Sequence, residues 1–412
     1  MNKVFFNSIE LKTLAAASWL SDSGVEVSLS ENEKKFSFDS SFTLANRVFD
    51  VGYHAVDIGR NRIWDDVLSR LPIKWHQTEG SRALVSFGMT LKRFYSQSDL
   101  GEKFKNIDRG TYTDPYLRSL EGAFGTAFID YVLAEIVPSY AQNSIWKKKE
   151  FGSSELLKNI YPWFFPADSG QCKLPSVDHF HAIERPLGVR YPYAASFGSI
   201  SKALKLQLQG DIARGASAPL ALTGEHINSR GEISIPCTDA KVFVAAIDYF
   251  STAKKLGLSV PEFDQTNFYL TSIVGSNALK VDFNEYLVGE LRHRFDRISS
   301  PDFLRGADEI RTLQFETELL EPVNESVLID ELMAFAKTQF GLASADAVDV
   351  KNVKINRFSD PDLTEKTEAI VKVLEDANPG FVVSNRSLAF QNLSDGVPQL
   401  ISRIEDSLNE QQ

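Results

Sequence analysis

The sequence predicts an α/β fold with a parallel β-sheet, and two features of the chain support this prediction. The first thirty residues follow the pattern strand, helix, strand, with apolar side chains at helical spacing over residues 11–22. Gly24 ends this helix, and the alternating run 25–29 suits a strand that is parallel to the first. The tail from Ser326 returns to helix, strand and helix, as chains that leave a parallel sheet commonly do.

The middle of the chain has a different pattern, so we expect a discontinuous organisation. Residues 66–165 are mainly helical in pattern and rich in aromatic side chains, and prolines flank the aromatic run 161–166. Strand patterns at 241–247, 267–274 and 279–283 indicate a β-rich unit. The predicted division gives the first domain residues 1–65, 185–240 and 330–412, the helical insertion 66–165, and the β-rich domain 166–184 and 241–329.

Composition restricts the classes of partner. The chain has 412 residues, of which 43% are hydrophobic and 24% charged, as in a globular protein of two or three packed units. A net charge of -11 argues against binding to nucleic acid, because such binding needs Lys and Arg at the phosphates. We find no secretory signal and no run near the roughly 18 apolar residues of a membrane span, so we expect a cytoplasmic protein. The oligomeric state stays open, with a homo-oligomer among the alternatives.

The residues that usually carry metal or nucleophile chemistry are few. Cys172 and Cys237 do not make a disulfide framework, and we expect both to be buried thiols. His179 and His181 would share one face of a strand, but a single pair lacks the further ligands of a metal site. We therefore predict no metal. No Ser-His-Asp order or recognisable carboxylate pair occurs, so the catalytic residues are unknown.

The first turn decides whether the opening unit holds a nucleotide. A dinucleotide-binding turn, which opens a Rossmann-like domain, has Gly-x-Gly-x-x-Gly so that the backbone can approach the pyrophosphate. Here Ser8, Glu10 and Thr13 stand at those three positions. Glu31 lies at the tip of the second strand, where an acidic residue accepts hydrogen bonds from a ribose. The alternative is an ordinary βαβ unit that binds no nucleotide.

Glu10 is the largest departure from this fingerprint. Its carboxylate adds bulk and negative charge where a pyrophosphate must come close to the backbone. Two unit charges about 4 Å apart repel by roughly 4 kcal/mol at an effective dielectric constant of about 20, which weakens binding by nearly three powers of ten. The frame of the unit is thus present while the site for the phosphates is altered.

The segment 50–65 resembles the region after the first βαβ unit in UDP-galactopyranose mutases. In that family a Gly-x-His turn approaches the flavin ring, and an Ile-Trp or Val-Trp pair follows on a helix. Gly52 and His54 match this turn, while Asp57 stands in place of a second histidine. The resemblance implies that Gly52 and His54 lie at the cofactor. The alternative for His54 is a helix cap or a core position.

The run 311–318 resembles the Tyr-Arg-Ser-Leu-x-Phe-Glu run of the same mutases, with Ile310 in place of the tyrosine. There the arginine binds the diphosphate of the sugar nucleotide, which suits a planar guanidinium. The resemblance gives this role to Arg311, and a surface ion pair is the alternative. Residues 294–299 look more like the related protoporphyrinogen oxidases and amine oxidases.

Two further segments follow in the same order as in the family. Residues 383–395 resemble the C-terminal Gly-Arg segment that touches the cofactor phosphates, which implies cofactor contacts for Asn385, Arg386 and Asp395. Asn385 occupies the position of the glycine. Residues 190–200 resemble the Pro-x-Gly-Gly turn before a helix, and this adds Arg190 to the substrate-binding candidates.

Taken together, the four segments imply a Rossmann-like FAD/NAD(P)-binding domain with a helical insertion and a β-rich substrate domain, and a UDP-sugar as ligand. Trp146 and Trp163 could stack on its uracil or sugar, or pack in the core. Three interpretations follow: an active FAD-dependent mutase or oxidoreductase, a cofactor-free relative that retains a sugar-nucleotide site, and a scaffold for a protein partner. The lost glycines favour a mutase-related protein of sugar-nucleotide or surface-glycan metabolism with impaired or absent FAD binding.

Overall fold

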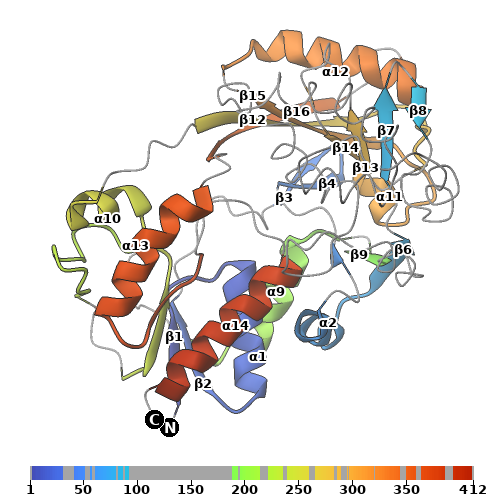
Figure 1. Ribbon diagram of the computed structural model, residues 1–412. Helices are drawn as coiled ribbons and strands as arrows, with labels where there is room; N and C mark the ends of the chain where they lie inside the picture. Colours follow the sequence, from blue (N-terminus) through green and yellow to red (C-terminus); the bar gives the residue numbers. More distant parts are fainter. Residues whose placement is uncertain are drawn as a thin grey trace, which may run out of the picture.

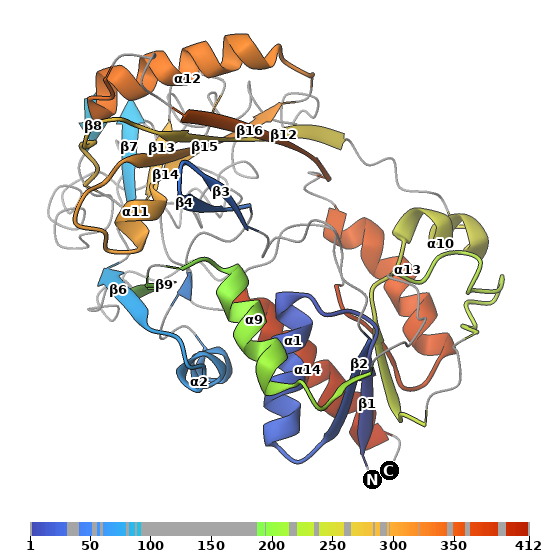
Figure 2. The same cartoon turned by 180° about the vertical axis from the view of Figure 1, so that it is seen from behind.

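Two β-sheets organise the molecule, one wholly parallel and one mostly antiparallel (Figures 1 and 2). The parallel sheet lies at the end where the two chain termini meet, and the second sheet lies beyond it in both views. The computed structural model describes residues 2–30, 41–51, 56–57, 61–79, 82–86, 89–91, 188–193, 195–213, 221–234, 239–258, 265–282, 285–288, 295, 297–319, 321–343, 349–358, 363–385 and 393–410.

The parallel sheet has the strand order β10-β2-β1-β11-β17. Every neighbouring pair in it is parallel, and β1 lies in the centre between β2 and β11. The chain therefore builds outward from β1 on one side, then returns to add strands on the other side. The strands are β1 (Lys3–Phe6), β2 (Glu26–Ser30), β10 (Ile212–Ala213), β11 (Val242–Ala245) and β17 (Phe381–Val383).

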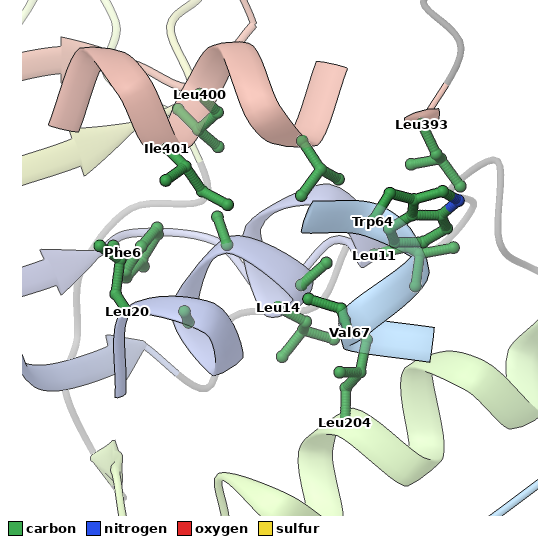
Figure 3. Packing of buried hydrophobic residues seen from close by; sticks show 14 of the residues in the cluster. Phe6, Leu11, Leu14, Leu20, Trp64, Val67, Leu204, Leu393, Leu400 and Ile401 are labelled. Atoms are coloured by element: carbon green, nitrogen blue, oxygen red, sulfur yellow. The ribbon is translucent and has the colours of Figure 1, made fainter. Parts of the chain in front are cut away.

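Helices cover both faces of this sheet (Figure 1). One face is covered by α1 and α14, on which α2 and α9 pack, and the other by α10 and α13. Figure 3 shows part of the first core, in which Phe6 of the sheet lies on the side of Ile401 of α14, and Leu14 of α1 lies beside Val67 of α2. The helices are α1 (Leu11–Asp22), α2 (Arg62–Ser69), α9 (Gly198–Gln207), α10 (Tyr249–Leu256), α13 (Leu363–Ala377) and α14 (Leu393–Glu410).

The end of α1 is set by its sequence. Val25 N donates to Leu20 O, and Gly24 N donates to Ser21 O. Gly24 has a φ of 83°, a left-handed conformation that glycine adopts without steric cost. The predicted helix 11–22, the strand after it and the parallel pairing of the two strands are thus confirmed.

The second sheet has the order β16-β12-β15-β14-β13-β7-β8. Helix α12 covers one face, where Phe295, Phe315 and Phe335 meet edge to face. The hairpin β3–β4 lies toward the other face, where Val51 packs on Phe268. The elements are β3 (Ser41–Leu44), β4 (Arg47–Asp50), β7 (Arg82–Ser86), β8 (Met89–Leu91), β12 (Gln265–Val274), β13 (Glu285–Val288), β14 (Arg297–Ser299), α11 (Pro301–Leu304), β15 (Thr312–Leu319), α12 (Glu325–Phe340) and β16 (Asp349–Phe358).

A small three-stranded sheet completes the fold. Strand β9 (Gly188–Pro192) pairs antiparallel with both β5 (Val56–Asp57) and β6 (Trp75–Glu79). Its last residues lead directly into α9, so it connects the helical layer of the parallel sheet with the region of β6 and β7.

The start of the predicted helical insertion contains strands. Residues 75–79, 82–86 and 89–91 form β6, β7 and β8 instead of helix, because β6 pairs with β9 and β7 pairs with β13, both distant in sequence. Such pairings override a local helical pattern. Residues 92–165, the rest of the predicted insertion, lie outside the described ranges, as do the aromatic run 161–166 and residues 166–184, which we expected in the β-rich domain.

Sheet membership also departs from the predicted domain boundaries. Strand β11, which we expected in the β-rich domain, lies in the parallel sheet between β1 and β17, where all four of its residues are buried. Helix α12 and strand β16 belong to the second sheet, although we expected residues 330–412 in the first domain. The strand predicted at 279–283 is absent from the described residues 279–282, and β13 begins at Glu285. No described helix is long and apolar enough to cross a membrane.

Candidate functional site

The carboxyl ends of the central strands form the candidate site. From β1 the chain proceeds to β2 on one side, whereas β11 lies on the other side, and ligands of open α/β sheets bind at such a switch point. The N-terminus of α1 lies at the same edge, because the turn 7–10 joins it to β1. Buried polar side chains collect at these strand ends: Asn7, Ser8, Ser30 and Ser384 are each at most 3% exposed.

The structure brings the three fingerprint positions together on one turn and fills them with side chains. Ser8 is 3% exposed and Thr13 is 1% exposed. Thr13 Oγ1 lies 2.9 Å from the carbonyl oxygen of Ser8 and 2.8 Å from that of Glu10, and Ser8 Oγ lies 3.5 Å from Thr13 Oγ1. The threonine hydroxyl thus closes the turn upon itself, in space that a glycine would leave open.

Glu10 is the N-cap residue of α1. Its backbone is extended, with φ -75° and ψ 156°, and its carbonyl accepts the first helical hydrogen bond, from Leu14 N at 2.9 Å. Its side chain is half-buried and does not cap the helix. Glu10 therefore occupies the helix terminus where backbone N–H groups favour an anionic ligand.

Lys12, which sequence reasoning missed, is the one lysine that the structure buries among its described residues. Only 9% of it is exposed, and it forms no hydrogen bond or salt bridge with any described residue. Burial lowers the pKa of its amine to about 8; attraction to Glu10 raises this pKa, and repulsion from Arg403 lowers it further. A lysine in the first turn of a helix, where acidic residues are preferred, was the available signal.

Replacing Lys12 by methionine is expected to stabilise the protein at pH 7 by up to about 3 kcal/mol, since a pKa lowered by about 2.5 units reflects a buried charge that folding disfavours. Between about pH 8 and 10.5 the amine of Lys12 is protonated more fully in the unfolded chain than in the folded protein. The wild type therefore regains stability as the pH rises through that range. Urea unfolding at pH 7 and pH 10 measures the difference between the two proteins. If the difference in free energy of unfolding between the two proteins were the same at pH 7 and pH 10, the result would contradict the burial of a charged amine.

The end of β17 is held by an ion pair that the sequence did not reveal. Arg403 of α14 donates to Val383 O at 2.9 Å and pairs with the carboxylate of Glu375, which in turn accepts from Val383 N at 3.0 Å. Asn385 follows directly, half-buried, and its carbonyl accepts a hydrogen bond from Tyr249 Oη. Asp395 lies in the first turn of α14. These contacts fix the strand end that faces the candidate site.

The other predicted site residues lie apart from this turn or outside the described ranges. Arg311 immediately precedes β15 of the second sheet, and its guanidinium donates to Ser276 O at 3.2 Å and to Glu309 at 2.9 Å. Arg190 lies on β9, with its Nε 3.5 Å from Gln77 Oε1. Their proposed substrate contacts stay predictions. Outside the described ranges are Glu31, Gly52, His54, Arg386, Trp146 and Trp163.

A buried ionic cluster joins the region of α9 to the second sheet. Asp50, at the end of β4, accepts a hydrogen bond from Phe197 N at 2.9 Å and lies 3.8 Å from Arg305 Nη2. Arg305 also donates to Ala195 O at 2.7 Å and to Tyr191 Oη at 3.3 Å. Burial raises the pKa of Asp50 to about 7, against the opposing effects of Arg305 and of the Phe197 N–H.

The backbone of Asp50 takes part in the same junction. Gln314 of β15 donates from Nε2 to Asp50 O at 2.8 Å. Because Asp50 and Val51 immediately precede the predicted Gly-x-His turn, the cluster fixes the chain just before the turn that the resemblance places at the cofactor. The sequence pattern indicated Asp50 only as the first residue of the segment 50–65, and it did not indicate Arg305.

No protein-family model and no curated protein matches the chain. Solved structures do match over its whole length. A reduced UDP-galactopyranose mutase has a TM-score of 0.66 and 14% identity, covering 100% of this chain and 96% of its own. A putative protoporphyrinogen oxidase from Exiguobacterium sp. 255-15 has a TM-score of 0.59 and 10% identity, and putrescine oxidase bound to putrescine has 0.55 and 12%, each covering 99% of both chains. The chain therefore has the Rossmann-type FAD/NAD(P)-binding α/β fold of these structures.

Proposed function

We propose that this protein is a relative of UDP-galactopyranose mutases that binds a UDP-sugar and binds FAD weakly or not at all. The observation that carries the proposal is the turn between β1 and α1. Thr13 and Ser8 are buried there, and the hydroxyl of Thr13 bonds to the backbone of the turn itself. Flavin's pyrophosphate needs the backbone of this turn to be accessible, and these side chains do not fit that requirement.

The charge of Glu10 supports the same conclusion. Glu10 is the N-cap residue of α1, at the helix terminus where a pyrophosphate binds in dinucleotide-binding folds. Like charges there oppose binding in addition to the steric effect. We accordingly assign no step of a flavin reaction to this chain, and we place its function in sugar-nucleotide or surface-glycan metabolism as a binding protein.

One observation favours a second candidate, an active FAD-dependent mutase or oxidoreductase. The positive charge of Lys12 lies in the same first helical turn and is attracted to Glu10, so it offsets part of the repulsion toward a phosphate. A scaffold for a protein partner has less support. The exposed large apolar side chains of the described residues, Tyr193, Leu206 and Val327, lie on separate segments and make no continuous patch.

The first experiment is an absorbance spectrum of the purified protein from about 300 to 550 nm, before and after gel filtration with excess FAD. We expect no flavin bands to stay with the protein. Calorimetric titration with UDP-galactose, which should show binding, completes the test. Bound flavin would favour the active enzyme, and absence of UDP-galactose binding would overturn the proposed ligand.

A matched pair of variants tests the predicted diphosphate contact. Arg311→Gln should weaken UDP-galactose binding, because a charge-assisted contact to a phosphate is lost. Arg62→Gln, which changes an exposed arginine on α2, should bind as the wild type does. Equal affinities of the two variants would remove Arg311 from the site.

A further inference from the structure

The parallel sheet ends at β17, which pairs with β11 alone among the strands that the structure describes. An edge strand carries backbone N–H and C=O groups that point away from its sheet and can pair with another chain. The run 380–384, Gly-Phe-Val-Val-Ser, has no charge and no proline, and all three residues of β17 are buried. Runs of this composition pair readily as strands, so this edge requires a means of closure.

The backbone of Val383 points to the open side of β17. Ser384 N donates to Ala245 O at 2.8 Å, so the N–H of Ser384 faces β11. Successive residues of a strand direct their backbone groups to alternate sides, which turns those of Val383 and Phe381 away from β11. The N–H of Phe381 is already occupied, because it donates to Asn378 O at 2.9 Å in the preceding turn.

Two charged side chains occupy both outward groups of Val383. Glu375 Oε1 accepts from Val383 N at 3.0 Å, and Arg403 Nη1 donates to Val383 O at 2.9 Å. Arg403 also pairs with the same carboxylate oxygen of Glu375. The acceptor, the donor and the ion pair between them thus supply the hydrogen bonds that a neighbouring strand would provide.

The two charged residues come from helices on opposite faces of the sheet. Glu375 lies on α13, whose Leu374 belongs to one core, and Arg403 lies on α14, whose Ile404 belongs to the other. The ion pair therefore crosses the edge of the sheet from one helical layer to the other. Its side chains are 20% and 19% exposed, and so accessible a pair adds little to stability by itself. Its place on the strand backbone indicates a different role.

We propose that the Arg403–Glu375 pair takes the place of a sixth strand at this edge and prevents β17 from pairing with β17 of a second copy of this chain. A second copy fits because the same apolar run can pair antiparallel with itself about a two-fold axis, with Phe381 opposite Val383. Such pairing requires the N–H and C=O of Val383, both of which the ion pair occupies. This closure needs no ligand, so it is independent of the proposed function.

The test removes the ion pair and follows both the strand backbone and the assembly state. In the double variant Glu375→Met with Arg403→Met, methionine keeps helix-forming side chains without charge. At low protein concentration the Val383 amide should exchange its hydrogen about 10- to 100-fold faster than in the wild type, as expected for loss of a hydrogen bond to a charged group. Mass spectrometry with fragmentation resolves this amide. In sedimentation velocity the mass of the double variant should rise toward twice that of the wild type as concentration increases.

A matched control is Asp22→Asn with Arg70→Met, which removes an ion pair between the ends of α1 and α2 and should behave as the wild type does. Glu375→Met alone, which frees only the Val383 amide, should show the faster exchange with weaker association. Circular dichroism establishes that each variant is folded. Unchanged exchange at Val383, or a double variant that does not associate, would overturn the inference. Association that leaves the Val383 amide unprotected at high concentration would also overturn it, because pairing through β17 must protect that amide again.

Discussion

Changing Ser8 and Glu10 together to glycine is expected to increase the affinity for FAD by about three powers of ten. Glu10→Gly removes a negative charge whose repulsion of a phosphate about 4 Å away amounts to roughly 4 kcal/mol at an effective dielectric constant of about 20. Ser8→Gly removes a buried side chain at the end of β1. Fluorescence titration of FAD, whose emission changes on binding, measures the gain against the wild type.

Glu10→Gln separates the effect of the charge of Glu10 from the effect of its bulk. Glutamine keeps the bulk of the side chain without its charge, so this variant should recover only the electrostatic part of the gain. Adding Thr13→Gly to the double variant opens the last filled position and should increase the affinity again, because Thr13 Oγ1 no longer closes the turn. If none of these variants binds FAD more tightly than the wild type, the turn is not the obstacle and its assignment as the site of the cofactor's pyrophosphate is wrong.

The second large effect concerns Asp50. Its folded pKa of about 7 lies above the usual 3.8, so the folded protein binds more protons than the unfolded chain between these values. Asp50 therefore stabilises the fold at low pH relative to neutral pH, by about 1.4 kcal/mol per pH unit and about 4 kcal/mol over the full interval. The free energy of unfolding of the wild type, compared with that of Asp50→Asn, should fall by up to about 3 kcal/mol from pH 5 to pH 8.

Comparing the two proteins at each pH cancels the titration of all other groups. Asparagine retains an acceptor for Phe197 N, and any constant cost from the unpaired Arg305 does not alter the slope. Urea unfolding in the same buffers supplies the values. A constant difference would show that Arg305 keeps Asp50 ionised throughout, and the pKa of the carboxyl group would then lie near or below its usual value.

Local patterns in the sequence were sufficient to predict the strand–helix–strand unit with which the fold begins. Residues 11–22 form α1 because the apolar spacing is regular and Gly24 ends the helix, both of which depend on near neighbours. Strand β12 is likewise confirmed near its expected bounds, 267–274. The place of β11 could not be predicted locally, since a short apolar run suits a buried strand in either sheet.

The site residues that sequence reasoning missed depend on distant contacts. Lys12 is buried because α14, which starts at Leu393, packs on α1. Asp50 is buried among Phe197 and Arg305, which come from two other segments. No pattern around Lys12 or Asp50 contains this information, whereas the altered fingerprint at Ser8, Glu10 and Thr13 is visible from spacing alone.

The packing of α1 against α14 has a consequence for the chain during synthesis. The two termini meet at one end of the parallel sheet (Figures 1 and 2), and the core around Leu14 includes Leu400 and Ile401. At about 5–20 residues per second, α1 leaves the ribosome roughly 20 to 80 seconds before its partner helix exists. Its apolar face must stay covered by other means during that interval, so the nascent chain is expected to be a substrate for chaperones that bind exposed apolar segments.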